Sequence, residues 1–314
     1  MRRLAVAIAA AAAVLGMAGT SAGQDSPERM RCFGAAARDR ERPCVNRALR
    51  LTVFPTPQEA RGGLNSPCEP IRDGQAPYSC AFGAHWEGAV KTIGLVGDSH
   101  AAHWRAALDV AARRRGWHGI SLTETGCSLT KATPVLKGRR RDDCVAYNRA
   151  LVTWLESHPQ VETLFTSQHG GKVMTAPGQS QEDAQTEGFL RAVEELPPTV
   201  RQVVVIRDTP WSSRRTPACV TEAVLDRRRP DRACALPRER ALRRDVAAEV
   251  ARRLRSPRLQ LVNLTPFMCD RTRCFPVVGG ALVHKDAGHI TQVFSRTLGP
   301  YLGRALDRLP PPAP

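Results

Sequence analysis

Several signatures of common enzyme classes are missing from this chain of 314 residues. It has no Walker A, HExxH or GxGxxG motif, which disfavours phosphate-loop, zincin-type and dinucleotide-binding sites. No GxSxG elbow occurs, which disfavours the larger α/β-hydrolase class. Aromatic residues make up only 5% and no nucleic-acid-binding motif is present. We therefore expect no nucleic-acid partner.

Long hydrophobic runs are also missing, except near the start. Residues 1–23 begin with a positive segment, Arg2 and Arg3, continue as an Ala/Val/Leu run and end on small residues. This pattern predicts a secretory signal peptide, and the alternative is an uncleaved anchor. No later stretch approaches the length of a membrane span, so we expect no transmembrane segment after signal removal and a secreted or envelope location.

Zinc-type cysteine spacings are absent as well: there is no CxxC and no Cys/His cluster. An even number of cysteines in an exported chain instead predicts disulfides. Each consecutive pair encloses a short loop, which favours sequential pairing. Each bond contributes about 2–4 kcal/mol in the loop-closure account. The predicted bonds are Cys32–Cys44, Cys68–Cys80, Cys127–Cys144, Cys219–Cys234 and Cys269–Cys274.

Positive charge is abundant. The formal net charge is +16, and removal of the two arginines of the signal leaves 16 − 2 = +14. The arginines are scattered in short groups. They are either solvated helix ends and loops or a means of attraction to an acidic cell-envelope polymer.

The chain divides into four segments: the signal 1–23, a Cys/Pro-rich segment 24–88 that we expect to be dominated by loops, a strand–helix region 89–308 and a Pro-rich tail 309–314. Apolar strands are predicted at 91–97, 118–124, 161–167, 202–207 and 259–265. Helices are predicted at 101–115, 143–158, 180–196, 237–255 and 289–306. This alternation predicts a three-layer α/β/α sandwich with a five-stranded parallel sheet.

A serine stands where the first strand turns into a helix, in IGLVGDSHAAHW. Ser99 is either a helix N-cap or a nucleophile at the carboxyl edge of the sheet, where sites of parallel sheets lie. A nucleophile needs a base and an orienting acid. Asp286 and His289 in KDAGHIT, before the last helix, are candidates, and the alternative is an N-cap aspartate beside an exposed histidine.

These segments resemble the SGNH (GDSL-type) hydrolases. The resemblance is closer to the SGNH domain of membrane acyltransferases that O-acetylate envelope polysaccharides. IGLVGDSHAAHWRAAL, the glycine-cysteine of TETGCS, VVVIRDTPW, LTPFMCDRTRCF, VHKDAGHIT and FSRTLGPYL carry it, over about residues 90–306. The resemblance implies a flavodoxin-like SGNH fold, and it favours the nucleophile over the cap for Ser99.

The resemblance also implies roles. Ser99 would be the nucleophile, His289 the general base and Asp286 the acid that orients it. The N–H groups of Ser99 and Gly126 would form the oxyanion hole. The family's third donor is usually an asparagine, and the segment SQHGG here has none, so Gln168 is the substitute. One lost donor can cost about 100-fold in rate.

Other residues are candidates with two interpretations. His100 and His103 have metal-like spacing, but no acidic third ligand is near in the sequence, so we expect no metal. His100 is expected to hydrogen-bond near the turn and to contribute to substrate binding. Trp211 either lines a sugar cleft or is buried. The Cys269–Cys274 bond precedes the Asp286 turn, and we expect it to preorganise that turn.

The sequence thus predicts an exported serine esterase or O-acyltransferase that acts on an acylated envelope glycan, through an acyl-serine and without a cofactor. The related domain usually follows a membrane module that supplies acyl groups, so a separate membrane acyl-donor protein is a possible partner. Hydrolysis and transfer both remain open. The alternative is a non-catalytic glycan-binding protein with the same fold, which the missing asparagine favours.

Overall fold

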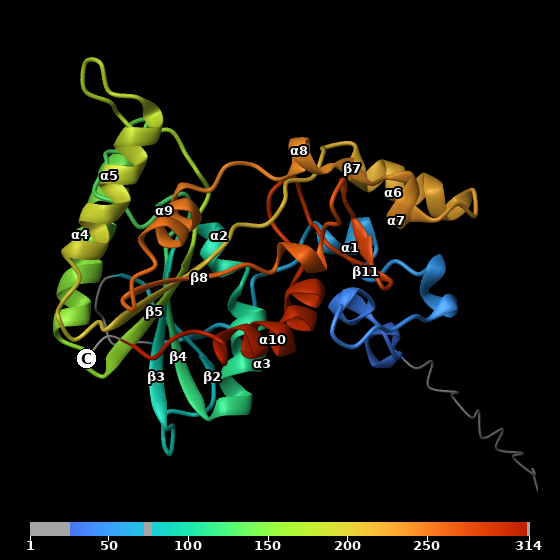
Figure 1. The fold of residues 1–314 in the computed structure, drawn as a ribbon, viewed down its shortest axis with the longest axis horizontal. Helices are drawn as coiled ribbons and strands as arrows, with labels where there is room; N and C mark the ends of the chain where they lie inside the picture. The colour runs from blue at the N-terminus through green and yellow to red at the C-terminus, as the bar shows by residue number, and fades with distance from the viewer. Residues whose placement is uncertain (1–25, 72–76, 313–314) are drawn as a thin grey trace, which may run out of the picture.

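A seven-stranded sheet runs through the protein, in the order β1-β2-β4-β3-β5-β6-β8 (Figure 1). The structure is a computed structural model that describes residues 26–71 and 77–312, so the predicted signal peptide lies outside the described residues. Five parallel strands match the predicted segments: β3 (Lys91–Gly97), β4 (Trp117–Thr123), β5 (Val161–Ser167), β6 (Gln202–Ile206) and β8 (Leu259–Val262). Numbered along the chain, the parallel strands lie in the flavodoxin-like order 2-1-3-4-5.

Two further strands extend the sheet at one edge. β1 (Glu69–Pro70) and β2 (Cys80–Gly83) come from the segment that we expected to be loops, and β2 pairs antiparallel with β4. The Cys68–Cys80 bond joins the start of β1 to β2. The five-stranded parallel sheet is therefore present, with an antiparallel addition.

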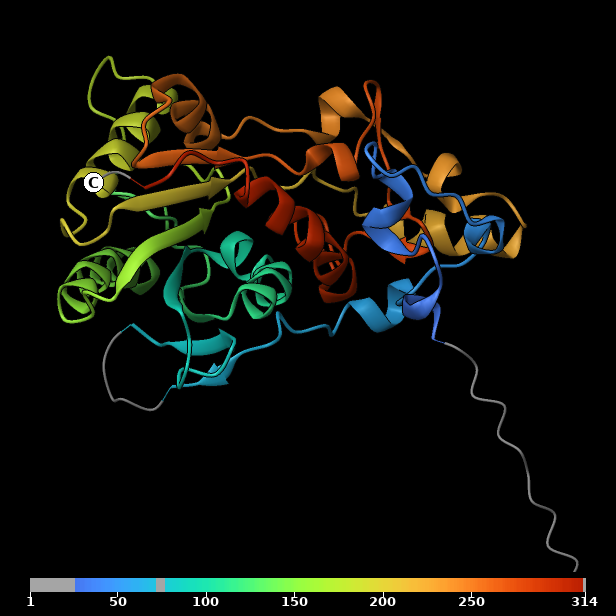
Figure 2. The ribbon, with the colours of Figure 1, turned by 60° about the horizontal axis from the view of Figure 1, so that its bottom comes forward.

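Both faces of the sheet are buried, as the apolar strands predict. In β6, Val203 and Val205 belong to one hydrophobic cluster, and Val204 and Ile206 belong to the other. Because side chains alternate along a strand, this division shows that each face carries its own core. The first cluster lies under α4 (Arg139–Glu156), α5 (Gln181–Glu194) and α9 (Val246–Leu254), and the second under α3 (Arg105–Arg115) and α10 (Gln292–Leu306) (Figure 2).

Two predicted helices are interrupted. The helix expected at 101–115 is α2 (Ser99–Ala102) followed by α3, with a break at His103 and Trp104. The prediction of one continuous helix at 237–255 is wrong. This segment forms α8 (Arg238–Ala241) and then α9, because the Asp245 side chain caps a new helix by accepting the N–H of Ala248.

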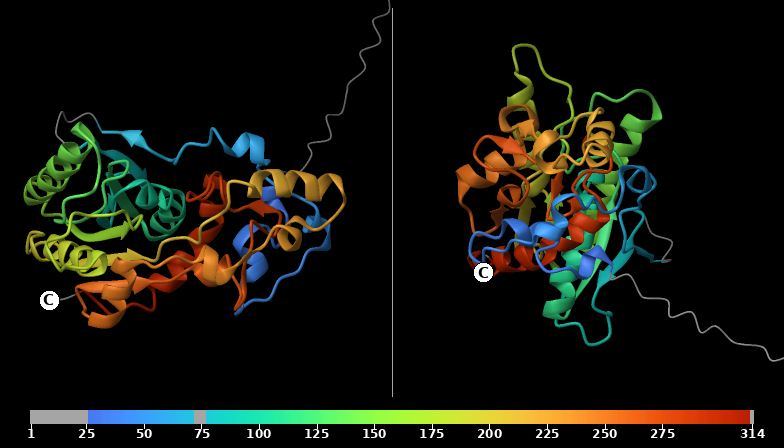
Figure 3. Two further views of the ribbon diagram at one scale, coloured as in Figure 1. Left: turned by 90° about the horizontal axis from the view of Figure 1, so that it is seen from above. Right: turned by 90° about the vertical axis from the view of Figure 1, so that its right-hand side faces the viewer.

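A second region lies beside the sheet and is built mainly of short elements (Figure 3). Its elements are η1 (Pro27–Arg29), η2 (Gly34–Arg38), η3 (Arg47–Arg50), α1 (Pro57–Ala60), α6 (Thr216–Leu225), α7 (Pro230–Ala233), β7 (Leu236–Pro237), η4 (Thr265–Phe267), β9 (Arg273–Cys274), β10 (Val277–Val278) and β11 (Ala281–Leu282). None of its helices was predicted. In all three views of the fold, the N-terminal segment lies against the late residues of the chain.

Backbone contacts fix this second region. The N–H of Phe54 donates to the carbonyl of Gly280, and the N–H of Leu282 donates to the carbonyl of Phe54. Gly34 has φ of +63°, and a Cβ there would lie 2.4–2.6 Å from side-chain atoms of Thr297 in α10. Only glycine fits this approach of the N-terminal segment to the last helix.

The sequential disulfide pairing is confirmed for all five bonds. Three of them, Cys32–Cys44, Cys219–Cys234 and Cys269–Cys274, lie in the second region, where regular structure is scarce. No helix among the described residues combines the length and the apolar character that a membrane crossing requires.

Candidate active site

The turn after β3 is shaped by Gly97. Its φ is +123°, and a Cβ there would meet the Ser167 carbonyl oxygen and the Thr166 Oγ1 at 3.2 Å. A larger residue would be strained in this conformation and crowded by the neighbouring strand. The turn therefore delivers Asp98 and Ser99 to the carboxyl edge of the sheet, beside the end of β5.

Asp98, and not Ser99, is the N-cap of α2. Its Oδ1 accepts the N–H of His100, while its Oδ2 accepts the N–H of His169 and the hydroxyl of Ser128. Burial raises the pKa of Asp98, and these three hydrogen bonds oppose that shift. The N-cap interpretation of Ser99 is thus wrong, because Asp98 already caps the helix and leaves the Ser99 hydroxyl free for another partner.

That partner is His289. The Nε2 of His289 lies 2.8 Å from the Oγ of Ser99, and the Nδ1 lies 2.9 Å and 3.0 Å from the two carboxylate oxygens of Asp286. These distances fall within hydrogen-bond range for a nucleophile, its base and an orienting acid. The structure therefore brings together the three residues that the sequence suggested, although 190 positions separate Ser99 from His289.

Asp286 and His289 stand on a turn that several segments hold. Thr291 is the N-cap of α10, so Asp286 does not cap that helix. The N–H of Ser212 donates to the carbonyl of Ala287, which ties the turn to the loop after β6. The ammonium of Lys285 donates to the carbonyl of Gly63, so the N-terminal segment reaches the same turn.

Asp286 is held in its charged form. Partial burial raises its pKa, but hydrogen bonds from the His289 ring and from the N–H groups of Gly288 and His289 outweigh burial and lower the pKa well below the ordinary value. A carboxylate in this position fixes His289 with Nδ1 protonated and Nε2 free to accept a proton. It also stabilises the imidazolium that forms when His289 takes that proton.

Two of the expected oxyanion donors, Gly126 and Gln168, line one cavity together with Asp98, the residue before Ser99. Within the described residues, the N–H groups of Ser99 and Gly126 donate to no acceptor. Gly126 has φ of +78° in the turn after β4. Gln168 follows β5 and lines one cavity together with Asp98 and Gly126, and its Oε1 is buried with no hydrogen-bond partner in the described part of the chain. The arrangement suits the assigned roles, which remain predictions.

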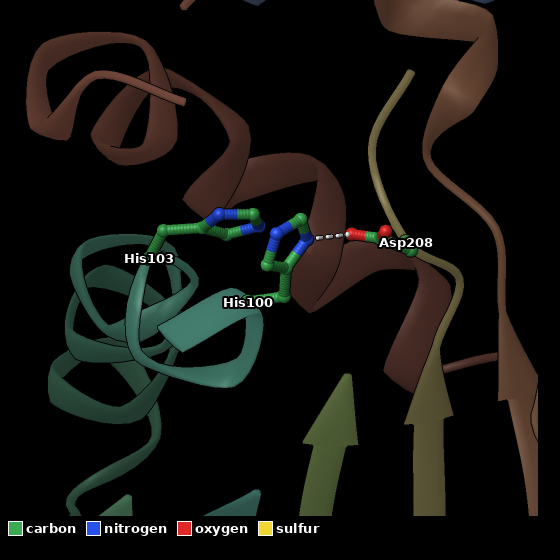
Figure 4. A group of neighbouring side chains, drawn as sticks. All are labelled: His100, His103 and Asp208. Carbon is green, nitrogen blue, oxygen red and sulfur yellow. Dashed lines mark hydrogen bonds and ion pairs between the residues drawn. The ribbon is translucent and has the colours of Figure 1, made fainter. Parts of the chain in front are cut away.

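His100 packs against His289, with ring centroids 4.8 Å apart, and it pairs with an acid that was not predicted. Its Nδ1 is 2.7 Å from the Oδ1 of Asp208, which follows β6 (Figure 4). The N–H of Asp208 in turn donates to Asp245. Burial raises the pKa of Asp208 to about 8 and that of Asp245 to about 6, and burial lowers the pKa of His100 to about 4. The pair therefore favours a shared proton with little net charge.

Aromatic rings pack around His100. The ring of His169 stacks on it with centroids 5.1 Å apart, and the ring of Trp211 lies 4.9 Å from His169. Trp211 is partly exposed, and the Arg243 guanidinium lies 3.6 Å from its ring centroid. Burial lowers the pKa of His169 to about 4, with repulsion from His100 and Arg243 adding to it. Trp211 is thus not a core residue, and its role in lining a sugar cleft stays a prediction.

Neither His169 nor Asp208 was predicted to contribute. Both follow the carboxyl end of a parallel strand, His169 after β5 and Asp208 after β6, and that position was the available signal. The charge state of the histidines beside His289 affects how easily His289 can take a proton. Because burial keeps His100 and His169 neutral at pH 7, neither repels an imidazolium at His289.

His103 bears on the question of a metal. One ligand atom each from His100, His103 and Asp208 lie within 4.8 Å of one another, so the acidic third ligand that the sequence lacked nearby is supplied by the loop after β6. Both ring nitrogens of His103 are buried, with no partner among the described residues. Ligands of tetrahedral Zn²⁺ at 2.0–2.2 Å lie about 3.4 Å apart, so these groups would have to close around an ion. The expectation of no metal remains a prediction.

Comparison with known structures supports the fold. The periplasmic domain of a lipopolysaccharide acetyltransferase from Salmonella ser. Paratyphi A superposes with a TM-score of 0.54 at 13% identity, over 72% of this chain and 91% of its own. A second solved structure, 15% identical, aligns over 70% of this chain and 98% of its own, with a TM-score of 0.40 that carries no argument. No curated protein matches the sequence.

The family comparison extends over most of the chain. A family model described as the SGNH domain (fused to AT3 domains) matches residues 67–304, about three quarters of the sequence. That range contains the sheet, the Ser99 turn and the Asp286–His289 turn. The chain therefore belongs to the SGNH domain family that occurs fused to AT3 domains.

Proposed function

We propose that this protein is an exported serine esterase or O-acyltransferase that forms an acyl-serine at Ser99 and acts on an acylated cell-envelope glycan. The observation that carries the proposal is the continuous hydrogen-bonded series Asp286–His289–Ser99, with steps of 2.9 Å and 2.8 Å. SGNH membership and the acetyltransferase neighbour support an esterase or acyltransferase role. The five disulfides and the predicted signal peptide fit an extracytoplasmic location.

The chemistry follows from the geometry. His289 Nε2 accepts the proton of Ser99 as the Oγ forms a bond to the acyl carbonyl carbon, and the carbonyl electrons move to the oxygen. The N–H groups of Ser99 and Gly126, with the Gln168 amide as a third donor, would stabilise that oxyanion. Collapse breaks the bond to the leaving group, which is the sugar oxygen in hydrolysis and a group of the acyl donor in transfer. The leaving group takes the proton from His289, and the acyl group stays on Ser99.

The second half repeats these steps with a new nucleophile. Water or a sugar hydroxyl gives its proton to His289 and attacks the acyl carbon. His289 then returns the proton to the Ser99 Oγ as the ester bond to the serine breaks. Water gives a free acid and a sugar hydroxyl gives a new ester. The family is described by its fusion to AT3 domains, which supports a membrane acyl donor as partner. Trp211, which is partly exposed and stacks on His100, would contact the sugar. His100 is buried beneath this surface and would act by positioning the Trp211 ring.

Labelling of the mature, disulfide-intact protein with a fluorophosphonate probe tests this proposal, with the modified residue read by mass spectrometry. We expect label on Ser99, and loss of at least about 1000-fold in ester hydrolysis for Ser99→Ala and for His289→Ala. Ser157→Ala is the control, since its hydroxyl lies after α4 and donates to the carbonyl of Trp154, away from the triad.

One combination of results would contradict the proposal of an acyl-serine enzyme. If a folded protein takes no label at Ser99, and binds acylated polysaccharide equally well as Ser99→Ala, the protein is a glycan-binding member of the fold. The absent asparagine favours that second candidate. If a sugar acceptor raises the yield of esterified product, transfer is the reaction. If it leaves hydrolysis unchanged, the protein is an esterase.

A further inference from the structure

A cavity of about 540 Å³ reaches the Ser99 turn, because Asp98 is one of its lining residues, and its volume is in the range of small-molecule sites in proteins. Its walls are the loop 126–136, the first half of α4, the loop 168–173 and the start of α9. The Cys127–Cys144 bond joins two of these walls, because it links the loop after β4 to α4. The cavity is therefore built on fixed elements.

The cavity is continuous with the proposed oxyanion hole. Asp98, Gly126 and Gln168 line it together with His169. Arg140 marks the junction, since its Nη2 lies 3.5 Å from the position that a Cβ on Gly126 would occupy. A substrate with its carbonyl oxygen at the Gly126 N–H would therefore extend towards this cavity and past the Arg140 guanidinium.

The open walls are positively charged. Arg140, Arg149 and Lys172 line the cavity, and none of their side chains has an ion pair or hydrogen-bond partner in the part of the chain that the structure describes. The fourth lining cation, Lys131, pairs with Glu195, which stands outside the cavity lining.

The lining carboxylates do not neutralise these cations. Asp98 accepts three hydrogen bonds, from the N–H groups of His100 and His169 and from the Ser128 hydroxyl. Asp245 accepts the N–H groups of Asp208 and Ala248. Both carboxylates are nearly fully buried, so the three cations have no acidic partner within the cavity.

Apolar side chains complete the site. Val135 lines the cavity and is 57% exposed, and Met174, next to the lining residue Val173, is 58% exposed. A mixed surface of apolar groups and unpaired guanidinium and ammonium groups suits a sugar ring that carries an anionic substituent. Guanidinium groups bind carboxylate and phosphate oxygens through two parallel hydrogen bonds.

We propose that this cavity is the glycan-binding subsite and that it takes a sugar bearing a carboxylate or phosphate, held by Arg140, Arg149 and Lys172. This inference rests on the proposed function, since it names the substrate class of the same site. The sugar ring would pack against the apolar wall, and its anionic group would bind to the three cationic side chains in place of water.

The test compares three acetylated sugars: an O-acetyl glucoside, an O-acetyl glucuronate and an O-acetyl glucose 6-phosphate. Acetate release by the wild-type protein is expected to show a KM about tenfold or more lower for a charged ester than for the neutral one, and that preference is expected to weaken as salt is added. The better of the two charged esters identifies the anionic group. In Arg140→Gln/Arg149→Gln/Lys172→Gln, we expect the preference to disappear.

The matched control is Arg114→Gln/Arg252→Gln/Arg253→Gln, which removes the same charge from exposed positions late in α3 and α9. It should keep the preference. Equal KM values for charged and neutral esters in the wild-type protein, or equal effects of the two triple variants, would overturn the inference and leave the esterase proposal standing.

Calorimetry with Ser99→Ala separates the two proposals when no ester is turned over. Tighter binding of the charged sugars than of the neutral one, lost in the cavity variant, would support the anionic subsite even if the esterase proposal failed. Equal or undetectable binding of all three sugars would overturn the subsite.

Discussion

Ser99 stands on a strand–helix junction of the central sheet, whereas Asp286 and His289 stand on an irregular turn outside it. The junction is fixed by the sheet, by the backbone of Gly97 and by the buried carboxylate of Asp98. The turn is held by separate segments: the loop after β6 through Ser212, and the N-terminal segment through Lys285. We expect the Cys269–Cys274 bond, which precedes the turn, to restrict it further.

The difference shows how each half of the site is held in position. A buried junction within a sheet is held by cooperative packing, because its neighbours cannot move without opening the core. A surface turn lacks that support, and long-range hydrogen bonds restrict it instead. The second region therefore acts as a support for the acid and the base, and variants on the two sides should fail in different ways.

Among variants that keep the triad, the largest effect is expected on the junction side, from Asp98→Ala. Removal of this buried carboxylate leaves the N–H groups of His100 and His169 and the Ser128 hydroxyl without their acceptor. At roughly 1–3 kcal/mol for each unsatisfied group, we expect a loss of about 3 kcal/mol or more in the free energy of unfolding. Because Ser99 is the next residue, activity should fall about 100-fold or more as well.

Urea unfolding and ester hydrolysis measure the two losses. Asp98→Asn serves as the comparison, since its single amide oxygen keeps part of the acceptor set, and its losses should be smaller. A stability of Asp98→Ala equal to that of the wild-type protein would show that the hydrogen bonds of Asp98 do not hold the junction.

The intermediate effect is expected on the turn side, from Cys269→Ser/Cys274→Ser. This bond closes a loop of only 5 positions, for which the loop-closure account gives about 2 kcal/mol. The chain continues from Cys274 through β10 and β11 to Asp286, so we expect activity to fall about tenfold as the turn loosens. Thermal unfolding and kcat/KM provide the two measurements.

Cys219→Ser/Cys234→Ser is the matched control. Its bond closes 15 positions, which gives a loss of about 3 kcal/mol, but it joins α6 to the end of α7. This variant should lose more stability and less activity than the first. If both variants lost activity in proportion to stability, or if the first kept full activity, the Cys269–Cys274 bond would have no role in preorganising the turn.

The same division describes what could be predicted from the sequence. The junction side was accessible, because β3 and the residues after it carry a strong local pattern: an apolar strand, a glycine, then an amphipathic helix. The break at His103 and the start of α9 at Asp245 were missed, since periodicity continues across both. Asp245 is an N-cap residue type and was the available signal.

The turn side could be predicted only in part. Asp286 and His289 were found as a local pair, but their distance to Ser99 depends on pairing between the N-terminal segment and residues 277–282, which leaves no periodic signal. His169 and Asp208 were missed for a related reason. They meet at His100 only because β5 and β6 are neighbours in the sheet, and strand order is a property of the whole fold.

The smallest effect is expected between the two halves, at Asp208, where His100 from the junction meets the loop that holds the turn. Burial raises the pKa of Asp208 to about 8, against about 3.9 in an unfolded chain. Between these values the folded protein keeps a proton on Asp208 that the unfolded chain has released, so the contribution of Asp208 to stability should fall as pH rises from about 4 to about 8. The lowered pKa of His100 acts in the opposite direction between about 4 and 6.5, so the Asp208 contribution is read from the comparison with a variant. Asp208→Asn cannot ionise, and its amide group can still hydrogen-bond with His100 Nδ1. The Tm of Asp208→Asn should therefore fall less between pH 5 and pH 8 than the Tm of the wild-type protein. The Tm difference between the two proteins should shift by about 2 °C or more in favour of the variant over this range.

The exposed Asp226→Asn is the control. Parallel Tm profiles for all three proteins would mean that His100 and Asp208 hold their shared proton throughout this range, and that the two halves meet at a neutral pair which does not titrate.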